Sequence, residues 1–453
     1  MQSLRTWREI CDSTEGWRRC HLSPDQRRAK RRMLERVAET LSQNASLDDP
    51  VSVWWVPGRV EVLGKHTDYA GGRSLTSALE WGMVLAARPR PDGHVHIRDV
   101  AREVACDFPF SAEVTASRGS WTLYPRTVAR RLARDFPASE GGADIVLAGD
   151  LPSAAGLSSS SVLVVGIALL LADVLELRRQ PRGEIWDDAL RCAEYLACVE
   201  SGRQYCGLSS DRGVGTRGGS QDHIAILDSR AGHVSEFSYR PARLRRRRPL
   251  PEGCLWAIAS SGVKAPKTGS ARQLYNRLSD LAGEAIDLWN RHTGRQDPHL
   301  SAVLARGSED GTRLGRILER GGGRFTPQDL LRRLNHLQVE TALIESLPER
   351  LDAEGLQLLG SLVDRSQRAA EDLLQNQVPE TVHLARSARR LGACAASGFG
   401  AGFGGAVWAL IESGRAQAFL QAWKDDYRSA FPQRHQARFL TSLPASPATR
   451  LTR

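Results

Sequence analysis

The sequence lacks the features that mark secreted, membrane-spanning and metal-binding proteins. Its 453 residues include eight cysteines, with no CxxC pair and no apolar N-terminal leader. We therefore expect reduced thiols in a cytoplasmic protein and no disulfide framework. The longest apolar run, Val162 to Ala172, is too short for a membrane span, which needs roughly 20 residues. We expect this run to form a buried helix.

Basic residues exceed acidic ones, and the formal net charge is +10. The sharpest cluster comprises Arg240, Arg243 and residues 245–248. It has no interleaved aromatic residues and no sequence signature of a nucleic-acid-binding fold. We interpret it as a solvated loop and expect neither a nucleic-acid nor a membrane partner.

The order of predicted elements indicates an α+β protein with two lobes. Residues 1–48 are charged and helical in pattern, and we interpret them as an N-terminal extension that docks through Trp7, Trp17 and Leu34. We place a domain boundary near residue 250, between an N-terminal domain at 49–250 and a C-terminal domain at 251–453. The predicted strands are 51–56, 82–89, 95–99, 143–147 and a late strand within 399–411, and the predicted helices are 121–136, 158–177, 184–201, 268–292 and helix-rich 329–375.

Three stretches concentrate glycine, serine and charged residues. The first, Gly58 to Tyr69, reads GRVEVLGKHTDY and follows an apolar strand. Its carboxylate and imidazole groups can exchange hydrogen bonds with sugar hydroxyls, and arginine binds phosphate well. On composition alone, the stretch fits a charged hairpin loop equally well or better.

The second stretch, Pro152 to Ser161, reads PSAAGLSSSS and runs into the apolar helix. Small residues at a helix N-terminus let unpaired backbone N–H groups approach a phosphate. The alternative is a serine cap on a core helix. A cap needs only one side chain, so four consecutive serines exceed that requirement.

The third stretch, Gly398 to Gly405, ends in one of two GxGxxG strings, at 213–218 and 400–405. A dinucleotide fingerprint follows a strand and opens a helix. The first string follows a helix and a polar loop, and the second runs into a strand. We therefore reject dinucleotide binding, and the sequence contains no Walker A loop either.

Together, the three stretches resemble the motifs of the GHMP kinase superfamily. The first resembles the galactokinase pattern GR-x-N-L-I-G-E-H-T-D-Y, and the resemblance runs from about residue 51 to about residue 430. Trp121-x-x-Tyr124, residues 218–223 and the segment from His336 to Thr341 add to it. The resemblance implies a two-lobed GHMP kinase fold with its active site between the lobes. It also implies an ATP-dependent sugar 1-kinase, with galactose as the expected substrate.

The resemblance also implies roles for individual residues. Asp222 would accept or orient the proton of the sugar C1 hydroxyl, and Arg59 would stabilise charge on the transferred phosphoryl group. The implied sugar-binding residues are Lys65, His66, Asp68, Gly219 and Tyr275. The implied ATP phosphate-binding residues are Gly156, Leu157, Ser158, Ser159, Ser160 and Ser161, with Gly400, Gly402, Gly404 and Gly405 in the third motif. Ser160 and Glu200 would hold Mg²⁺, so ATP and Mg²⁺ are the implied cofactors.

Two departures from the pattern leave the sugar open. Lys65 stands where galactokinases have a glutamate that accepts a hydrogen bond from the sugar's far hydroxyl, and a lysine can only donate. Lys65 could pair with the carboxylate of galacturonic acid, or it could pair with Glu61 or another carboxylate and point away. The segment 211–219 is also longer and richer in arginine than the usual loop. A non-catalytic sugar-sensing homologue is the alternative of another class. We expect a monomer or a small homo-oligomer.

Overall fold

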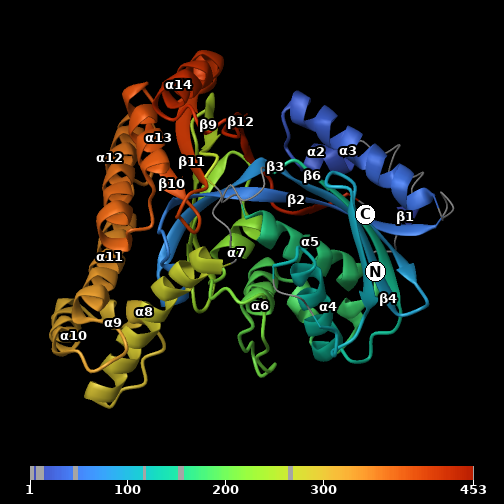
Figure 1. Ribbon diagram of the computed structural model, residues 1–453, viewed down its shortest axis with the longest axis horizontal. Helices are drawn as coiled ribbons and strands as arrows, with labels where there is room; N and C mark the ends of the chain where they lie inside the picture. The colour runs from blue at the N-terminus through green and yellow to red at the C-terminus, as the bar shows by residue number, and fades with distance from the viewer. Residues whose placement is uncertain are drawn as a thin grey trace.

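The chain folds into two lobes, and the computed structural model describes residues 5–6, 15–43, 49–115, 119–151, 158–263 and 269–451. Figure 1 shows the N-terminal lobe in blue to green and the C-terminal lobe in yellow to red, with a sheet and helices in each. The expectation of a two-lobed α+β protein is confirmed.

The N-terminal lobe is built on a ten-stranded sheet with the central order β1-β2-β3-β6-β4-β5. Its longest strands, β2 (Pro50–Leu63) and β3 (Arg73–Arg90), are buried along almost their whole length. They read as apolar runs because helices cover both faces of the sheet. The remaining strands are β1 (Arg5–Thr6), β4 (His94–Asp99), β5 (Val104–Pro109), β6 (Gly142–Gly149), β7 (His233–Ser238), β8 (Arg243–Pro249), β13 (Pro444–Ala445) and β14 (Thr449–Arg450).

One face of this sheet packs against α5 (Ser159–Val174), which is buried on all sides as its apolar sequence predicts. Helices α4 (Leu123–Asp135), α6 (Ala189–Ser201) and α7 (Gln221–Asp228) surround α5. The helix predicted at 184–201 begins only at Ala189. Asp188 caps it by accepting a 2.8 Å hydrogen bond from the Arg191 backbone.

The N-terminal extension covers the opposite face of the sheet. Helices α2 (Glu15–Arg19) and α3 (Pro24–Ser42) pack there, with Trp17 and Leu34 buried as predicted, whereas Trp7 lies outside the described residues. Lys30 of α3 is completely buried and forms an ion pair with Asp150, which follows β6. The extension is therefore part of the folded lobe.

The C-terminal lobe has a four-stranded sheet with the order β10-β11-β9-β12. The strands are β9 (Cys254–Ser260), β10 (Ala395–Phe399), β11 (Ala406–Glu412) and β12 (Arg438–Ser442). One face buries apolar residues against α13 (Pro379–Arg390) and α14 (Ala416–Ala430). The other helices are α8 (Gly269–Thr293), α9 (Leu300–Leu304), α10 (Ser308–Arg320), α11 (Pro327–Glu345) and α12 (Ala353–Ala369). Helices α8 to α11 share a separate apolar core at the far end of the lobe.

Two features differ from the interpretation of the sequence. The arginine cluster is not a loop, because residues 243–249 form β8, which pairs with β7. Arg248 is buried there and lies 2.9 Å from Glu236, so the Glu236 carboxylate neutralises part of the cluster's charge.

The boundary near 250 falls between β8 and β9, yet β13 and β14 return to pair with β3 and β2. The domain division therefore remains a prediction.

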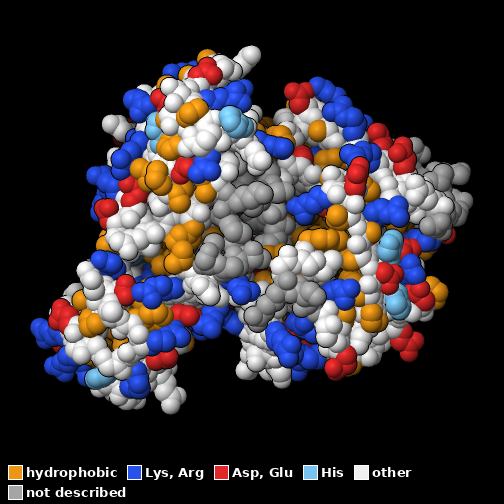
Figure 2. All heavy atoms as spheres, in the orientation of Figure 1, with side chains coloured by type: hydrophobic (Ala, Val, Ile, Leu, Met, Phe, Trp, Pro, Cys, Tyr) orange, Lys and Arg blue, Asp and Glu red, His pale blue; other side chains and the backbone are white. Residues whose placement is uncertain are grey.

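The face of the molecule shown in Figure 2 carries charged side chains of both signs. Basic side chains are spread over both lobes with acidic ones among them (Figure 2). No helix within the described part of the chain has the length and apolar content that crossing a membrane requires.

Candidate active site

A cavity lies between the lobes, and both lobes contribute to its wall. The N-terminal lobe supplies residues of β2, α5, α6 and α7, and the C-terminal lobe supplies α8 and the loop between β10 and β11. The lining residues include Arg59, Glu61, His66, Asp68, Tyr69, Arg102, Trp121, Tyr124, Ser158, Ser159, Ser160, Ser161, Glu200, Thr216, Gly219, Gln221, Asp222, His223, Tyr275, Phe399, Gly400, Ala401, Gly402 and Gly404.

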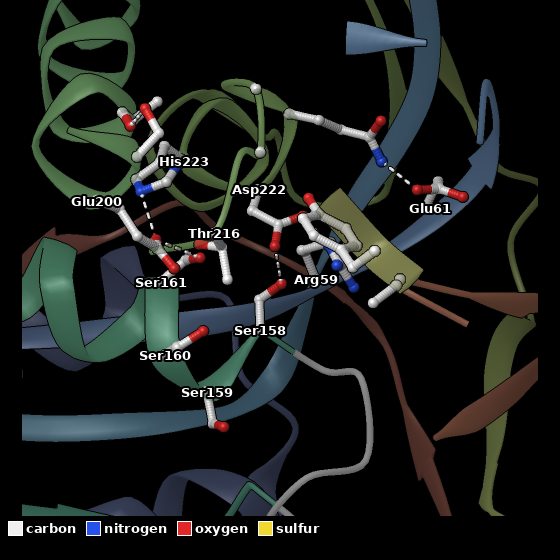
Figure 3. A pocket seen from close by; sticks show the side chains of 18 of the residues that line it. Arg59, Glu61, Ser158, Ser159, Ser160, Ser161, Glu200, Thr216, Asp222 and His223 are labelled. Carbon is white, nitrogen blue, oxygen red and sulfur yellow. Dashed lines mark hydrogen bonds and ion pairs between the residues drawn. The ribbon is translucent and has the colours of Figure 1, made fainter. Parts of the chain in front are cut away.

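Asp222 is the point at which three elements meet. Arg59 of β2 donates a 2.8 Å hydrogen bond from Nε to Asp222 Oδ1, and Ser158 donates from Oγ to Asp222 Oδ2 (Figure 3). The guanidinium of Arg59 is buried and lies 5.6 Å from the centre of the Phe399 ring. A buried charge is tolerated when it is paired and hydrogen-bonded. The arrangement therefore fixes a carboxylate beside a cation in the cavity wall.

The serine cluster lies at the start of α5. Ser158 adopts a left-handed backbone conformation with φ of 60°, and its side chain bonds to Asp222 instead of capping the helix. Positive φ in a residue other than glycine costs free energy and is common at functional sites. Ser159, Ser160 and Ser161 form the first turn, where backbone N–H groups favour an anion. Gly156 and Leu157 lie outside the described residues.

Ser160 and Glu200 both line this cavity, as the predicted metal site requires. Glu200 Oε2 accepts a 2.9 Å hydrogen bond from Ser161 Oγ and lies 3.0 Å from His223 Nε2. No cluster of three His, Cys, Asp or Glu side chains suited to a metal occurs among the described residues. A hydroxyl and a carboxylate beside bound phosphates are nevertheless the oxygen donors that Mg²⁺ uses, so the residues fit that ion.

His66 and Asp68 also line the cavity. His66 Nδ1 lies 3.0 Å from the Tyr69 hydroxyl and its Nε2 lies 3.2 Å from the Ala401 carbonyl. Burial, with the nearby Arg333 guanidinium, lowers the pKa of His66 to about 3, so the imidazole is neutral at pH 7. Burial raises the pKa of Asp68, although its Oδ2 accepts a 3.2 Å hydrogen bond from the Gln221 backbone. Both groups can therefore bind uncharged hydroxyls.

Two glycines allow close approaches in this wall. A Cβ atom on Gly219 would lie 2.4 Å from Asp68 Oδ2, so any side chain there would displace the carboxylate. Gly402 has φ of 79°, and a Cβ would lie 2.4 Å from the Asn376 carbonyl oxygen.

The remaining predicted residues of the wall are Tyr275 and the glycines of the third motif. The Tyr275 ring of α8 lies 5.5 Å from that of His66. Gly400, Gly402 and Gly404 line the cavity, whereas Gly405 is not among its lining residues and donates from its backbone to Val263.

Lys65 is the predicted sugar-binding residue that the structure does not bring to the cavity. Its Nζ donates a 3.0 Å hydrogen bond to Ser366 Oγ, and Ser366 in turn donates to Glu340 Oε1. Glu340 Oε2 also accepts a 2.8 Å hydrogen bond from the Gly64 backbone. Lys65 is 1% exposed and is absent from the cavity wall. This position favours the alternative in which Lys65 points away from the substrate, and substrate binding by Lys65 stays a prediction.

Sequence reasoning missed several lining residues, of which Glu61 is the most informative. Glu61 was considered only as a partner for Lys65, yet it lines the cavity two residues after Arg59 on the same strand. Alternation along a strand places both side chains on one face, and this was a usable signal. The galactokinase pattern has asparagine at this position, which was a second signal. Arg102 lies outside the motifs, and Thr216 lies in the glycine string 213–218 that we rejected as a dinucleotide site, so neither had a comparable signal.

Comparison with known proteins agrees with this geometry. Residues 44–89 match the family model described as the galactokinase galactose-binding signature, residues 124–209 match the GHMP kinase N-terminal domain, and residues 343–429 match the GHMP kinase C-terminal domain. The first model covers Arg59, His66 and Asp68, and the second covers the serine cluster and Glu200. The chain belongs to the galactokinase family of GHMP kinases.

Members of this family from bacteria align over most of the chain. A galactokinase of Chloroflexus aurantiacus is 29% identical over 385 residues, which cover 83% of this chain and 88% of the relative. A galactokinase of Streptomyces coelicolor is 27% identical over 406 residues, which cover 89% of this chain and 95% of the relative. The Lactococcus lactis galactokinase crystallised with galactose superposes with a TM-score of 0.74 at 21% identity, covering 92% of this chain and 99% of that one. This GHMP kinase is accordingly a phosphotransferase that shares the two-lobed fold.

Proposed function

We propose that the protein is an ATP-dependent galactokinase that phosphorylates the C1 hydroxyl of galactose. The observation that carries this proposal is the convergence of Arg59 and Ser158 on Asp222, at the N-terminus of α5. Phosphoryl transfer depends on positioning and on neutralising charge more than on covalent chemistry by the protein. The cavity provides an anion-binding helix end beside a carboxylate that can orient a hydroxyl.

Each group then has a role in the transfer. Asp222 accepts or orients the proton of the attacking hydroxyl, and Arg59 stabilises the negative charge that spreads over the transferred phosphoryl oxygens. The N–H groups of the first turn of α5 bind the ATP phosphates, together with the hydroxyls of Ser159 and Ser160. His66, Asp68, the backbone at Gly219 and Tyr275 bind the sugar.

Two oxygen-bearing side chains of the cavity wall would hold a metal ion beside the ATP phosphates. Ser160 and Glu200 would hold Mg²⁺, which supplies charge neutralisation on the phosphates when it is bound. Glu200 keeps its orientation through Ser161 and His223. We place the reaction in the cytoplasm, without a nucleic-acid or membrane partner, in a monomer or small homo-oligomer.

The experiment that tests the proposal is ADP release with MgATP against a panel of sugars. The panel contains galactose, galacturonic acid, glucose, arabinose and fucose. We expect turnover with galactose. Galactose binding without any turnover would instead support a sugar-sensing homologue, and turnover only with another sugar would replace galactose as the substrate.

A further inference from the structure

Glu61 places a carboxylate in the cavity wall next to the catalytic pair. Arg59 and Glu61 occupy alternate positions of β2, and both positions are regularly paired with β3, at Ala78 and Thr76. Both side chains therefore project from the same face of the strand. Both are buried, with Glu61 only 3% exposed, and both line the cavity.

Only one of the two carboxylate oxygens of Glu61 is satisfied within the described residues. Oε2 accepts a hydrogen bond from Gln221 Nε2 (Figure 3), whereas Oε1 is buried and has no hydrogen-bond partner in the part of the chain that the structure describes. A buried acceptor without a partner costs free energy that a ligand donor can recover. Gln221 also donates from its backbone to Asp68. Glu61 thus belongs to the same hydrogen-bonded group as Asp68.

Three acidic side chains line the cavity near this position, and the two nearest cations, Arg59 and Lys65, already have protein partners. Glu61, Asp68 and Asp222 all line the cavity, and Arg59 is held by Asp222. Lys65, the residue that could have met an acidic substrate, donates to Ser366 outside the cavity wall. A sugar carboxylate here would meet like charges, which disfavour binding at short range. A hydroxyl group would instead supply the missing donor.

We infer that Glu61 is a substrate-binding residue that selects uncharged sugars. Its Oε1 accepts a hydrogen bond from one hydroxyl of the sugar, and its carboxylate, when ionised, repels the carboxylate of a uronic acid. This inference depends on the proposed function, because it requires a sugar in the cavity. The inference makes Glu61 the acceptor of the hydrogen bond from the sugar hydroxyl, because the ammonium of Lys65 can only donate hydrogen bonds.

The test compares E61M and E61Q with E80Q as a matched control. Glu80 is also a buried glutamate of this sheet, but its two oxygens accept hydrogen bonds from the backbones of Ser23 and Leu443, and it does not line the cavity. We expect E61M, which removes both oxygens, to raise KM and Kd for galactose by about tenfold or more, with KM for ATP unchanged. E61Q keeps an oxygen that can accept a hydrogen bond, so it removes the charge alone. E80Q should leave both sugar constants unchanged. Thermal unfolding of each variant verifies that it is folded.

Deoxygenated galactoses identify the partner hydroxyl. One monodeoxy sugar should bind wild type weakly and bind E61M no more weakly than it binds wild type. Each of the other monodeoxy sugars should bind E61M more weakly than it binds wild type. The ratio of turnover with galacturonic acid to turnover with galactose should rise in E61Q, because the repulsive charge is gone.

The outcomes separate this inference from the proposed function. If wild type phosphorylates galactose but E61M has the same galactose KM and Kd, Glu61 is not a substrate-binding residue and the proposed function stands. If wild type prefers galacturonic acid, the selection of uncharged sugars is wrong, although a sugar kinase remains. If wild type shows no galactose binding by calorimetry and no turnover with any sugar of the panel, the proposed function is wrong and the inference is wrong with it.

Discussion

Arg59 and Asp222 lie 163 positions apart in the sequence and are joined by a 2.8 Å hydrogen bond in the cavity between the lobes. The strand β2 supplies the cation and the first turn of α7 supplies the carboxylate. Burial of Arg59 strengthens the pair because little solvent screens it. The pair fixes the position of the group that we propose as the hydroxyl-orienting carboxylate.

Replacing Asp222 with asparagine should abolish most turnover without weakening ATP binding. D222N keeps the shape of the side chain but removes the charge and the proton acceptor, and we expect kcat to fall by about 10²–10⁴-fold. The ATP dissociation constant, measured by calorimetry with a non-hydrolysable analogue, should stay within about threefold, since Asp222 is not a phosphate donor. D228N, at the last residue of the same helix, is the control and should retain wild-type turnover. Wild-type kcat in D222N would assign the role to another residue.

Replacing Lys65 with glutamate should destabilise the protein and leave its sugar preference unchanged. K65E would place a carboxylate beside Ser366 and Glu340, where the lysine ammonium now donates. We expect the free energy of unfolding to fall by about 3–5 kcal/mol, which is the loss seen when a buried ion pair is broken and a charge is left unpaired. The unfolding midpoint should therefore fall by several degrees. Adding E340Q should restore part of this loss. A K65E protein with the wild-type midpoint and a new sugar preference would contradict this reading.

Replacing Glu61 with glutamine should stabilise the protein at alkaline pH. Burial raises the pKa of Glu61 to about 7, so the folded state keeps a proton that the unfolded state has released. The stability of wild type should therefore decrease as pH rises from about 4.5 to about 7, and remain lower above that range. E61Q lacks this cost, which is on the order of 3 kcal/mol above pH 7. Calorimetric midpoints should coincide near pH 4 and differ by a few degrees at pH 8. Equal midpoints at pH 8 would show that this carboxyl ionises without cost.

Replacing Lys30 with methionine should show that the N-terminal extension stabilises the lobe. Lys30 is completely buried, pairs with Asp150 and lies 5.1 Å and 5.2 Å from the ring centres of Trp55 and Trp81. K30M keeps most of the side-chain volume but leaves Asp150 without its cation, so we expect a loss of about 3 kcal/mol. R32M changes an exposed arginine of the same helix and should have little effect. Urea unfolding of both variants measures the difference; equal midpoints would mean that the pair contributes nothing.

Local chemistry explains why much of the fold could be predicted from the sequence. The apolar run that follows the serine cluster predicts α5, because a helix without a polar face must be buried. The glycine-rich third motif precedes a strand, as the apolar residues from Ala406 predict. The arginine cluster was misread as a loop because strand pairing with β7, which is not local, overrides the polarity of these residues.

The order of residues along the chain settles which chemical groups are available: a serine-rich helix start that can bind phosphate, an arginine before a GxHxDY stretch, and an aspartate in a distant short helix. Which of these groups share a cavity depends on how the chain folds. The tertiary structure brought Arg59 and Ser158 to Asp222, placed Glu61 in the wall, and directed Lys65 to Ser366. The fold decides this because a buried polar side chain points toward the groups that can form hydrogen bonds with it. Those partners, Gln221 for Glu61 and Ser366 for Lys65, come from segments 160 and 301 residues away.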